Sequence, residues 1–164
     1  MNAEIIAIGS ELLTPFRQDT NSLYLTEKLN QLGVEIVIKT IVGDSRPRLV
    51  SVAQHALFRS DIVIFMGGLG PTEDDLTREA VAEALGLELH RDEEILEKLK
   101  QRFAARGYKM TPNNFQQADV IAGAVVVHLV LRRGAAVRAD FCRAADAKAL
   151  IPAAQRTRLE VGQV

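Results

Sequence analysis

The chain has 164 residues, enough for one domain with a buried core. Hydrophobic residues make up 48% and the net charge is −1, so nothing in the composition favours a nucleic-acid or membrane partner. The single cysteine, Cys142, excludes an internal disulfide and a multi-cysteine metal site, and we expect a cytoplasmic protein.

Short apolar runs alternate with helical patterns along most of the chain. The apolar runs predict strands at about 3–8, 35–42 and 61–66, with a last strand from Ala124 to Leu131. Helical periodicity and capping residues predict helices at about 20–32, 46–58, 74–85 and 92–106. This alternation is typical of βαβ units, so we expect an α/β fold with a mostly parallel sheet covered on both faces.

Residues 61–77 carry the strongest local signal, because a buried strand runs into a glycine turn and then into a helix start. Gly67, Gly68 and Gly70 leave little side-chain bulk in the way of a ligand, and Thr72 is the expected N-cap. Proteins of the α/β class bind phosphates with this arrangement. The alternative is a tight connection without a ligand.

Three carboxylates are expected at one edge of the sheet. Glu11, Asp44 and Asp75 each follow a predicted strand, and the carboxyl ends of parallel strands meet at the same edge. Because all three supply oxygen, they predict a site for Mg²⁺ or Mn²⁺, and other divalent cations such as Co²⁺ could also be accommodated. The alternative is that Glu11 and Asp44 are turn residues and that Asp75 complements a helix dipole.

Three further residues are candidates for ligand contacts. Asn21 and Tyr24 lie one turn apart near the start of the first predicted helix, where they could contact a nucleotide or ribose. Tyr24 is equally well explained as a half-buried core residue. Arg78 could bind a phosphate with two hydrogen bonds, or pair with a nearby acid.

Five motifs together resemble one known family. They are IGSELL (8–13), DTNSLYL (19–25), VGD (42–44), GGLGPTEDDLTREAVAEALG (67–86) and MTPNNFQQA (110–118). This pattern, over about residues 1–127, resembles the N-terminal domain of CinA-type competence/damage-inducible proteins. That domain belongs to the MoaB/Mog-like molybdopterin-binding superfamily.

The resemblance implies a three-layer α/β/α sandwich and a homo-oligomer. It implies metal-dependent hydrolysis of the pyrophosphate of a nucleotide such as ADP-ribose, with Asp44 and Asp75 as catalytic residues and metal ligands. Mog-like relatives instead bind molybdopterin through a glycine turn and an aspartate that matches Asp75, so molybdopterin binding is the second interpretation. An inactive module is the third.

The last part of the chain departs from the family pattern. After about residue 127 the GTAPG-type and PGPP-type turns of the family are missing, and large apolar residues become sparse. We therefore expect an incomplete domain over 1–131, followed by a divergent, poorly packed tail over 132–164. Truncation or a frameshift near Val127 would explain the change.

Overall fold

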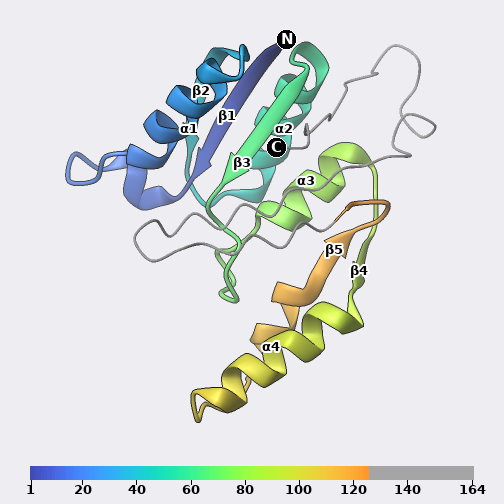
Figure 1. The fold of residues 1–164 in the computed structure, drawn as a ribbon. Coiled ribbons are helices and arrows are strands. Elements are labelled where there is room, and N and C mark those ends of the chain that lie inside the picture. Colours follow the sequence, from blue (N-terminus) through green and yellow to red (C-terminus); the bar gives the residue numbers. More distant parts are fainter. Residues whose placement is uncertain (126–164) are drawn as a thin grey trace.

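The first three strands form a parallel sheet, which lies in the upper part of the view in Figure 1. The structure, a computed structural model, describes residues 1–125; the predictions for the tail lie outside them. The strands are β1 (Asn2–Ile8), β2 (Glu35–Val42) and β3 (Ile62–Met66), in the order β2-β1-β3. Both pairings are parallel, which confirms the three predicted strands and their common direction.

The helices also follow the predicted pattern, with one exception. They are α1 (Thr20–Gln31), α2 (Arg46–Arg59), α3 (Thr77–Leu85) and α4 (Glu93–Ala105), with 3₁₀ helices η1 (Ser10–Leu13) and η2 (Pro112–Ala118). The prediction that α3 begins near residue 74 with Thr72 as its N-cap is wrong, because the N-cap is Leu76. Residues 72–75 form a turn instead, closed by a hydrogen bond from the Asp75 N–H to the Thr72 carbonyl.

The order of the strands places helices on both faces of the sheet. The chain moves from β1 to β2 through α1 and then back across β1 to β3 through α2. Because such crossovers are right-handed, the reversal of direction puts α1 and α2 on opposite faces (Figure 1). One large core lies between the sheet and the α2–α3 pair. Its buried members include Ile6, Ile8, Leu49, Leu57 and Val63.

A second, smaller sheet was not predicted. β4 (Leu89–Arg91) pairs antiparallel with β5 (Asp119–Ile121), and α4 and η2 lie between them in the sequence. Three-residue strands are too short to show a periodic pattern, so they could not be predicted from the sequence. Of the predicted strand Ala124–Leu131, Ala124 and Val125 are not in a strand and the other residues lie outside the described part.

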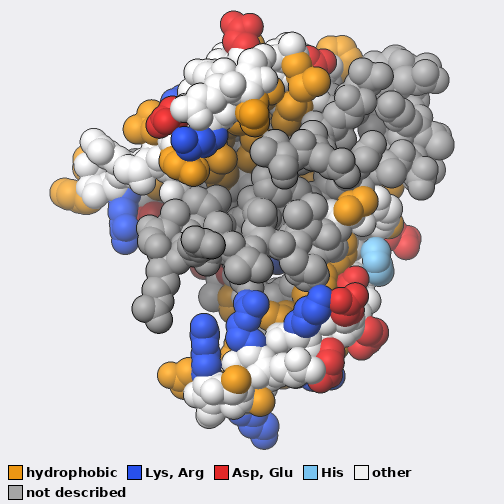
Figure 2. Space-filling view, in the orientation of Figure 1, with side chains coloured by type: hydrophobic (Ala, Val, Ile, Leu, Met, Phe, Trp, Pro, Cys, Tyr) orange, Lys and Arg blue, Asp and Glu red, His pale blue; other side chains and the backbone are white. Residues whose placement is uncertain are grey.

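The outer face of α4 is a solvated surface with mixed charges. Lys98 pairs with Glu94 one turn away, and Lys100 lies 3.7 Å from Glu97. Figure 2 shows basic and acidic side chains close together over this part of the molecule. Exposed pairs of this kind contribute little to stability.

Among residues 1–125 no helix has the length and apolar character that crossing a membrane requires.

One carboxylate is buried in the central strand. The side chain of Glu4 is 1% exposed, and Arg59 at the end of α2 binds it with Nε–Oε1 and Nη2–Oε2 distances of 2.6 and 2.8 Å. The Ser60 hydroxyl donates a third hydrogen bond, of 2.6 Å. The Arg59 guanidinium, acting against the cost of burial and together with Ser60, holds the pKa of Glu4 below its ordinary value.

Candidate functional site

A pocket of about 320 Å³ lies where β1 and β3 end. Its walls come from the last residues of these two strands and from the segment that joins β1 to α1. The lining residues are Ala7, Ile8, Glu11, Leu12, Arg17, Gln18, Asp19, Thr20, Asn21, Met66 and Gly67. After β1 the chain adds β2 on one side of it and then β3 on the other, so the strand order reverses between β1 and β3. Open α/β sheets bind ligands at such a switch point.

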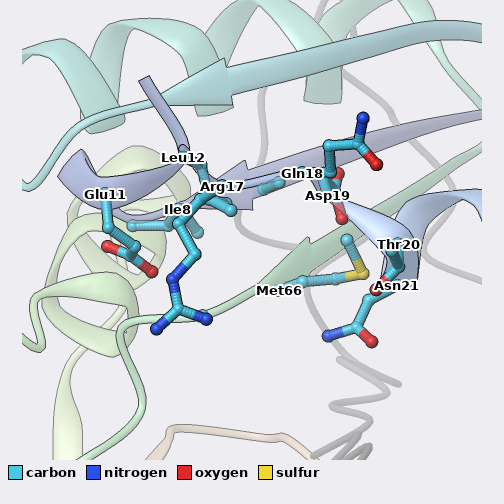
Figure 3. Close-up of a pocket in the computed structure, with 11 residues that line it drawn as sticks. Ile8, Glu11, Leu12, Arg17, Gln18, Asp19, Thr20, Asn21 and Met66 are labelled. Atoms are coloured by element: carbon cyan, nitrogen blue, oxygen red, sulfur yellow. The ribbon is translucent and has the colours of Figure 1, made fainter. Parts of the chain in front are cut away.

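Polar groups of both charges face this pocket (Figure 3). The Arg17 guanidinium and the Asn21 amide extend to the same side, with the Met66 side chain between them. The Glu11 carboxylate lies on the other side of Arg17. Asp19 also lines the pocket, but its Oδ1 accepts a hydrogen bond of 2.9 Å from the Ser22 N–H and so caps α1.

The turn after β2 is tied to the turn after β1. The Ser10 N–H donates to Asp44 Oδ2 over 2.8 Å, and the Asp44 N–H donates to the Ser10 hydroxyl over 3.1 Å. Asp44 therefore acts as a turn residue that fixes the start of η1. It does not line the described pocket.

The protein's own atoms occupy the space above the three glycines. A Cβ on Gly67 would overlap the Ile8 carbonyl oxygen, and one on Gly68 would overlap the Thr77 hydroxyl. A Cβ on Gly70 would lie 2.5 Å from Asp75 Oδ2. Close packing within the protein thus explains why glycine is needed here. Of the three, only Gly67 lines the pocket.

Asp75 closes the loop that follows the glycines. Its Oδ2 accepts hydrogen bonds from the Thr72 N–H and hydroxyl, at 2.8 and 2.5 Å. Burial raises the pKa of this carboxyl, but the hydrogen bonds from Thr72 and from the Gly70 backbone, with the charge of Arg78, outweigh it. The pKa therefore lies below its ordinary value, and Asp75 is ionised at neutral pH.

Arg78 fixes the same loop from the other side. Its Nη2 donates a hydrogen bond of 2.7 Å to the Leu69 carbonyl, while the Thr77 hydroxyl donates to the Gly67 carbonyl over 2.8 Å. Thr72, Asp75 and Arg78 all lie outside the pocket lining. These contacts make residues 67–78 a braced loop beside the pocket.

The three predicted carboxylates do not form one cluster. Glu11, Asp44 and Asp75 follow the three strands as expected, yet only Glu11 lines the pocket. Within residues 1–125 no group of three or more His, Cys, Asp or Glu side chains is arranged to hold a metal ion. The physical reason is that Asp44 turns toward η1 and Asp75 folds back over Gly70.

The two candidates on α1 have different surroundings. Asn21 lines the pocket, as expected for a ligand-contacting residue. The Tyr24 side chain lies outside the lining, is 49% exposed, and has the Lys28 ammonium 5.5 Å from its ring centre. Tyr24 is therefore neither a core residue nor part of this pocket.

Arg17, Gln18 and Thr20 were not singled out in the sequence. They belong to the connection between the first strand and the first helix, and such loops line the ligand sites of α/β proteins. The location of these residues after the first strand was therefore the one available sign that they line a ligand site. No residue pattern in this loop distinguishes ligand contacts from ordinary surface residues.

Residues 4–151 match a family model described as "probable molybdopterin binding domain". The match extends past residue 131, where we expected the domain to end and the tail to begin. That boundary stays a prediction. The chain is also similar to CinA-like proteins of Koribacter versatilis, with 67% identity, and Acidobacterium capsulatum, with 64% identity. Each alignment covers 127 residues, or 77% of this chain and 31% of the relative.

A solved structure supports the same fold. It is "the protein CinA with unknown function" from Thermoplasma acidophilum, which is 29% identical with a TM-score of 0.71. The alignment covers 77% of this chain and 74% of that one. This similarity confirms the predicted α/β fold with a parallel sheet. It also confirms the resemblance to CinA-type proteins, from which the three-layer sandwich was expected.

Proposed function

The chain belongs to the molybdopterin-binding-domain family, in which it is similar to CinA-like proteins, and we propose that it binds and hydrolyses a nucleotide pyrophosphate such as ADP-ribose. The observation that carries this proposal is the pocket at the switch point between β1 and β3. Because the chain spans 31% of the length of these relatives, the proposal concerns this domain alone.

The lining of the pocket suits a polar ligand with an apolar portion. Asn21 and Thr20 offer hydrogen bonds to hydroxyl groups, and Ile8, Leu12 and Met66 offer apolar surface. The braced loop 67–78 holds Gly67 at the pocket wall through the Thr77 hydrogen bond to the Gly67 carbonyl. A rigid wall favours binding because less conformational entropy is lost when the ligand binds.

Glu11 fits a cation that is shared with the substrate. An all-protein site would need several ligands at one point, and the described residues do not supply it. Mg²⁺ commonly uses one or two carboxylates together with substrate phosphates, and Glu11 is placed for this at the pocket. A bound divalent cation would supply charge neutralisation at the phosphoryl oxygens and a water of lowered pKa.

We expect Asp75 to act through the loop that it closes. In this proposal its negative charge, which the lowered pKa maintains at neutral pH, keeps Thr72 and Gly70 in place beside the pocket. Asp74, its neighbour, is exposed and has no such hydrogen bonds among the described residues. The two aspartates therefore form a matched pair for an experiment.

The test is to incubate the full chain with ADP-ribose and Mg²⁺, Mn²⁺ or Co²⁺ and to measure release of AMP. We expect metal-dependent release that Asp75→Asn lowers strongly, because an amide nitrogen cannot accept the hydrogen bond from the Gly70 N–H, and that Asp74→Asn leaves unchanged. Asp75→Asn should cost at most about 1 kcal/mol in the free energy of unfolding, because the amide oxygen still accepts from Thr72. Absence of AMP release, or an equal loss in both variants, would contradict the proposal.

Molybdopterin binding is the second candidate, and the family description is the observation that favours it. A pterin ring would occupy the same pocket against Met66 and Ile8. Saturable binding of molybdopterin without AMP release from ADP-ribose would support this function over the first. A chain that neither binds molybdopterin nor releases AMP would be an inactive module.

A further inference from the structure

We propose that Arg17 is the residue that recognises a phosphate group of the ligand in the pocket at the ends of β1 and β3. This inference deepens the proposed function, since it assigns the anionic part of the substrate to one side chain. It rests on the charges inside the pocket and on the partners of each charged group.

Arg17 is the cation of this pocket. Among its lining residues the side chains with a formal charge are Glu11, Arg17 and Asp19, and Arg17 alone is positive. A guanidinium presents several N–H donors in one plane, a geometry that matches two oxygens of a phosphate. The ligand's anionic group is therefore expected on the side of the pocket where Arg17 extends (Figure 3).

The other arginines with assigned partners bind groups of the protein itself. Arg46 pairs with Glu83, Arg59 with Glu4 and Arg91 with Asp119, and Arg78 donates to the Leu69 carbonyl. Within residues 1–125, neither a hydrogen bond nor an ion pair engages the Arg17 guanidinium. Its donors are thus available to a ligand, although it lies close to two carboxylates in the pocket lining.

The two carboxylates do not neutralise Arg17. Asp19 uses Oδ1 to cap α1, where the partial positive charge of the helix end offsets the negative charge of the carboxylate. Glu11 lies in the same lining yet forms no ion pair within the described residues, so its charge and that of Arg17 stay separate. This separation suits a ligand that places a phosphate at Arg17 and a metal cation at Glu11.

The separation of charges makes two opposite predictions. Loss of Arg17 should weaken binding of a phosphate group whether or not a metal ion is present. Loss of the Glu11 charge should weaken only the part of binding that Mg²⁺ adds, and without Mg²⁺ it should leave binding equal or tighter because repulsion is removed. A purely structural role for either residue would not produce this pattern.

The experiment is isothermal titration of the full chain with ADP-ribose and with inorganic pyrophosphate, each with and without Mg²⁺. The variants are Arg17→Ala, Arg17→Lys and Glu11→Gln. The matched control is Arg48→Ala, which removes an exposed arginine of α2 that is outside the pocket lining. For Arg17→Ala we expect the dissociation constant of both probes to rise about tenfold or more, as for a charge-assisted pair. Arg17→Lys should recover part of the loss, and Arg48→Ala should change binding by less than about twofold.

The outcomes separate this inference from the proposed function. Binding that depends on Arg17 without AMP release supports the phosphate site and removes the hydrolase proposal. AMP release that Arg17→Ala leaves unchanged, with unchanged binding of both probes, overturns the inference and keeps the proposed function. A wild-type chain that binds neither probe overturns both.

Discussion

Removing Arg59 should destabilise the protein through the carboxylate that it leaves behind. Glu4 is 1% exposed in the central strand, so Arg59→Ala would leave its charge with the Ser60 hydroxyl as the remaining side-chain partner. Breaking a buried pair in this way costs about 3–5 kcal/mol. The Arg59 side chain is 46% exposed, and its loss lets water approach Glu4, so we expect about 2–3 kcal/mol here.

The pH dependence makes this prediction specific. Because the folded pKa of Glu4 is lowered, its contribution to stability is complete above the unfolded pKa, near 4.5, and is lost as pH falls through the folded value. In Arg59→Ala the Glu4 charge is unfavourable, and protonation relieves it. The difference in the free energy of unfolding between wild type and variant should therefore shrink as pH falls from 7 toward 4.

Urea unfolding followed by circular dichroism at several pH values measures this difference. The control is Arg46→Ala, at the other end of α2, which breaks an exposed pair with Glu83 and should cost at most about 1 kcal/mol at every pH. A cost for Arg59→Ala below that of the control, or a difference that stays constant with pH, would refute the reasoning.

Two other predictions follow from contacts near the pocket. Gly67→Ala should destabilise by about 3 kcal/mol or more, because the new Cβ meets the backbone carbonyl of Ile8 at a φ of 94°, whereas Gly70→Ala should cost about 1–2 kcal/mol because the Asp75 side chain can move. Urea unfolding gives the order, and equal costs would show that the backbone clash is not decisive. Asp19→Ala and Asp92→Ala each remove an N-cap with a 2.9 Å hydrogen bond and should each cost about 1 kcal/mol. Titration with ADP-ribose should detect only the Asp19 change, since Asp92 is not among the residues of the pocket lining; an equal effect on binding would contradict the assignment of the pocket.

Much of the fold could be predicted from the sequence because the strands and helices are locally encoded. Apolar runs and capping residues such as Asp19 and Asp92 fixed most of the elements to within a residue or two. The N-cap of α3 could not be read in the same way. Thr72 and the acids after it have the composition of a helix start, but Thr72 and Asp75 bond to each other and form a turn.

The site was less predictable than the fold. The sequence places Glu11, Asp44 and Asp75 after three predicted parallel strands, and the structure confirms these strands and their common direction. Whether they converge depends on side-chain hydrogen bonds across the turns, such as the Asp44–Ser10 pair, and these are not visible in spacing. The same limit applies to Glu4, which looks like a surface residue at the start of an apolar run until Arg59 is seen beside it.

The pocket draws nearly all of its walls from one short stretch of the chain. Residues 7–21 provide nine of its eleven lining positions, and Met66 and Gly67 complete it. The residues that determine ligand selectivity are therefore concentrated in one segment. From Glu11 to Gln18 this segment is mostly exposed and contributes no buried residue to the core beside the parallel sheet. Exchange of this segment between relatives is a direct route to new ligand preferences, since the scaffold that carries it can stay unchanged.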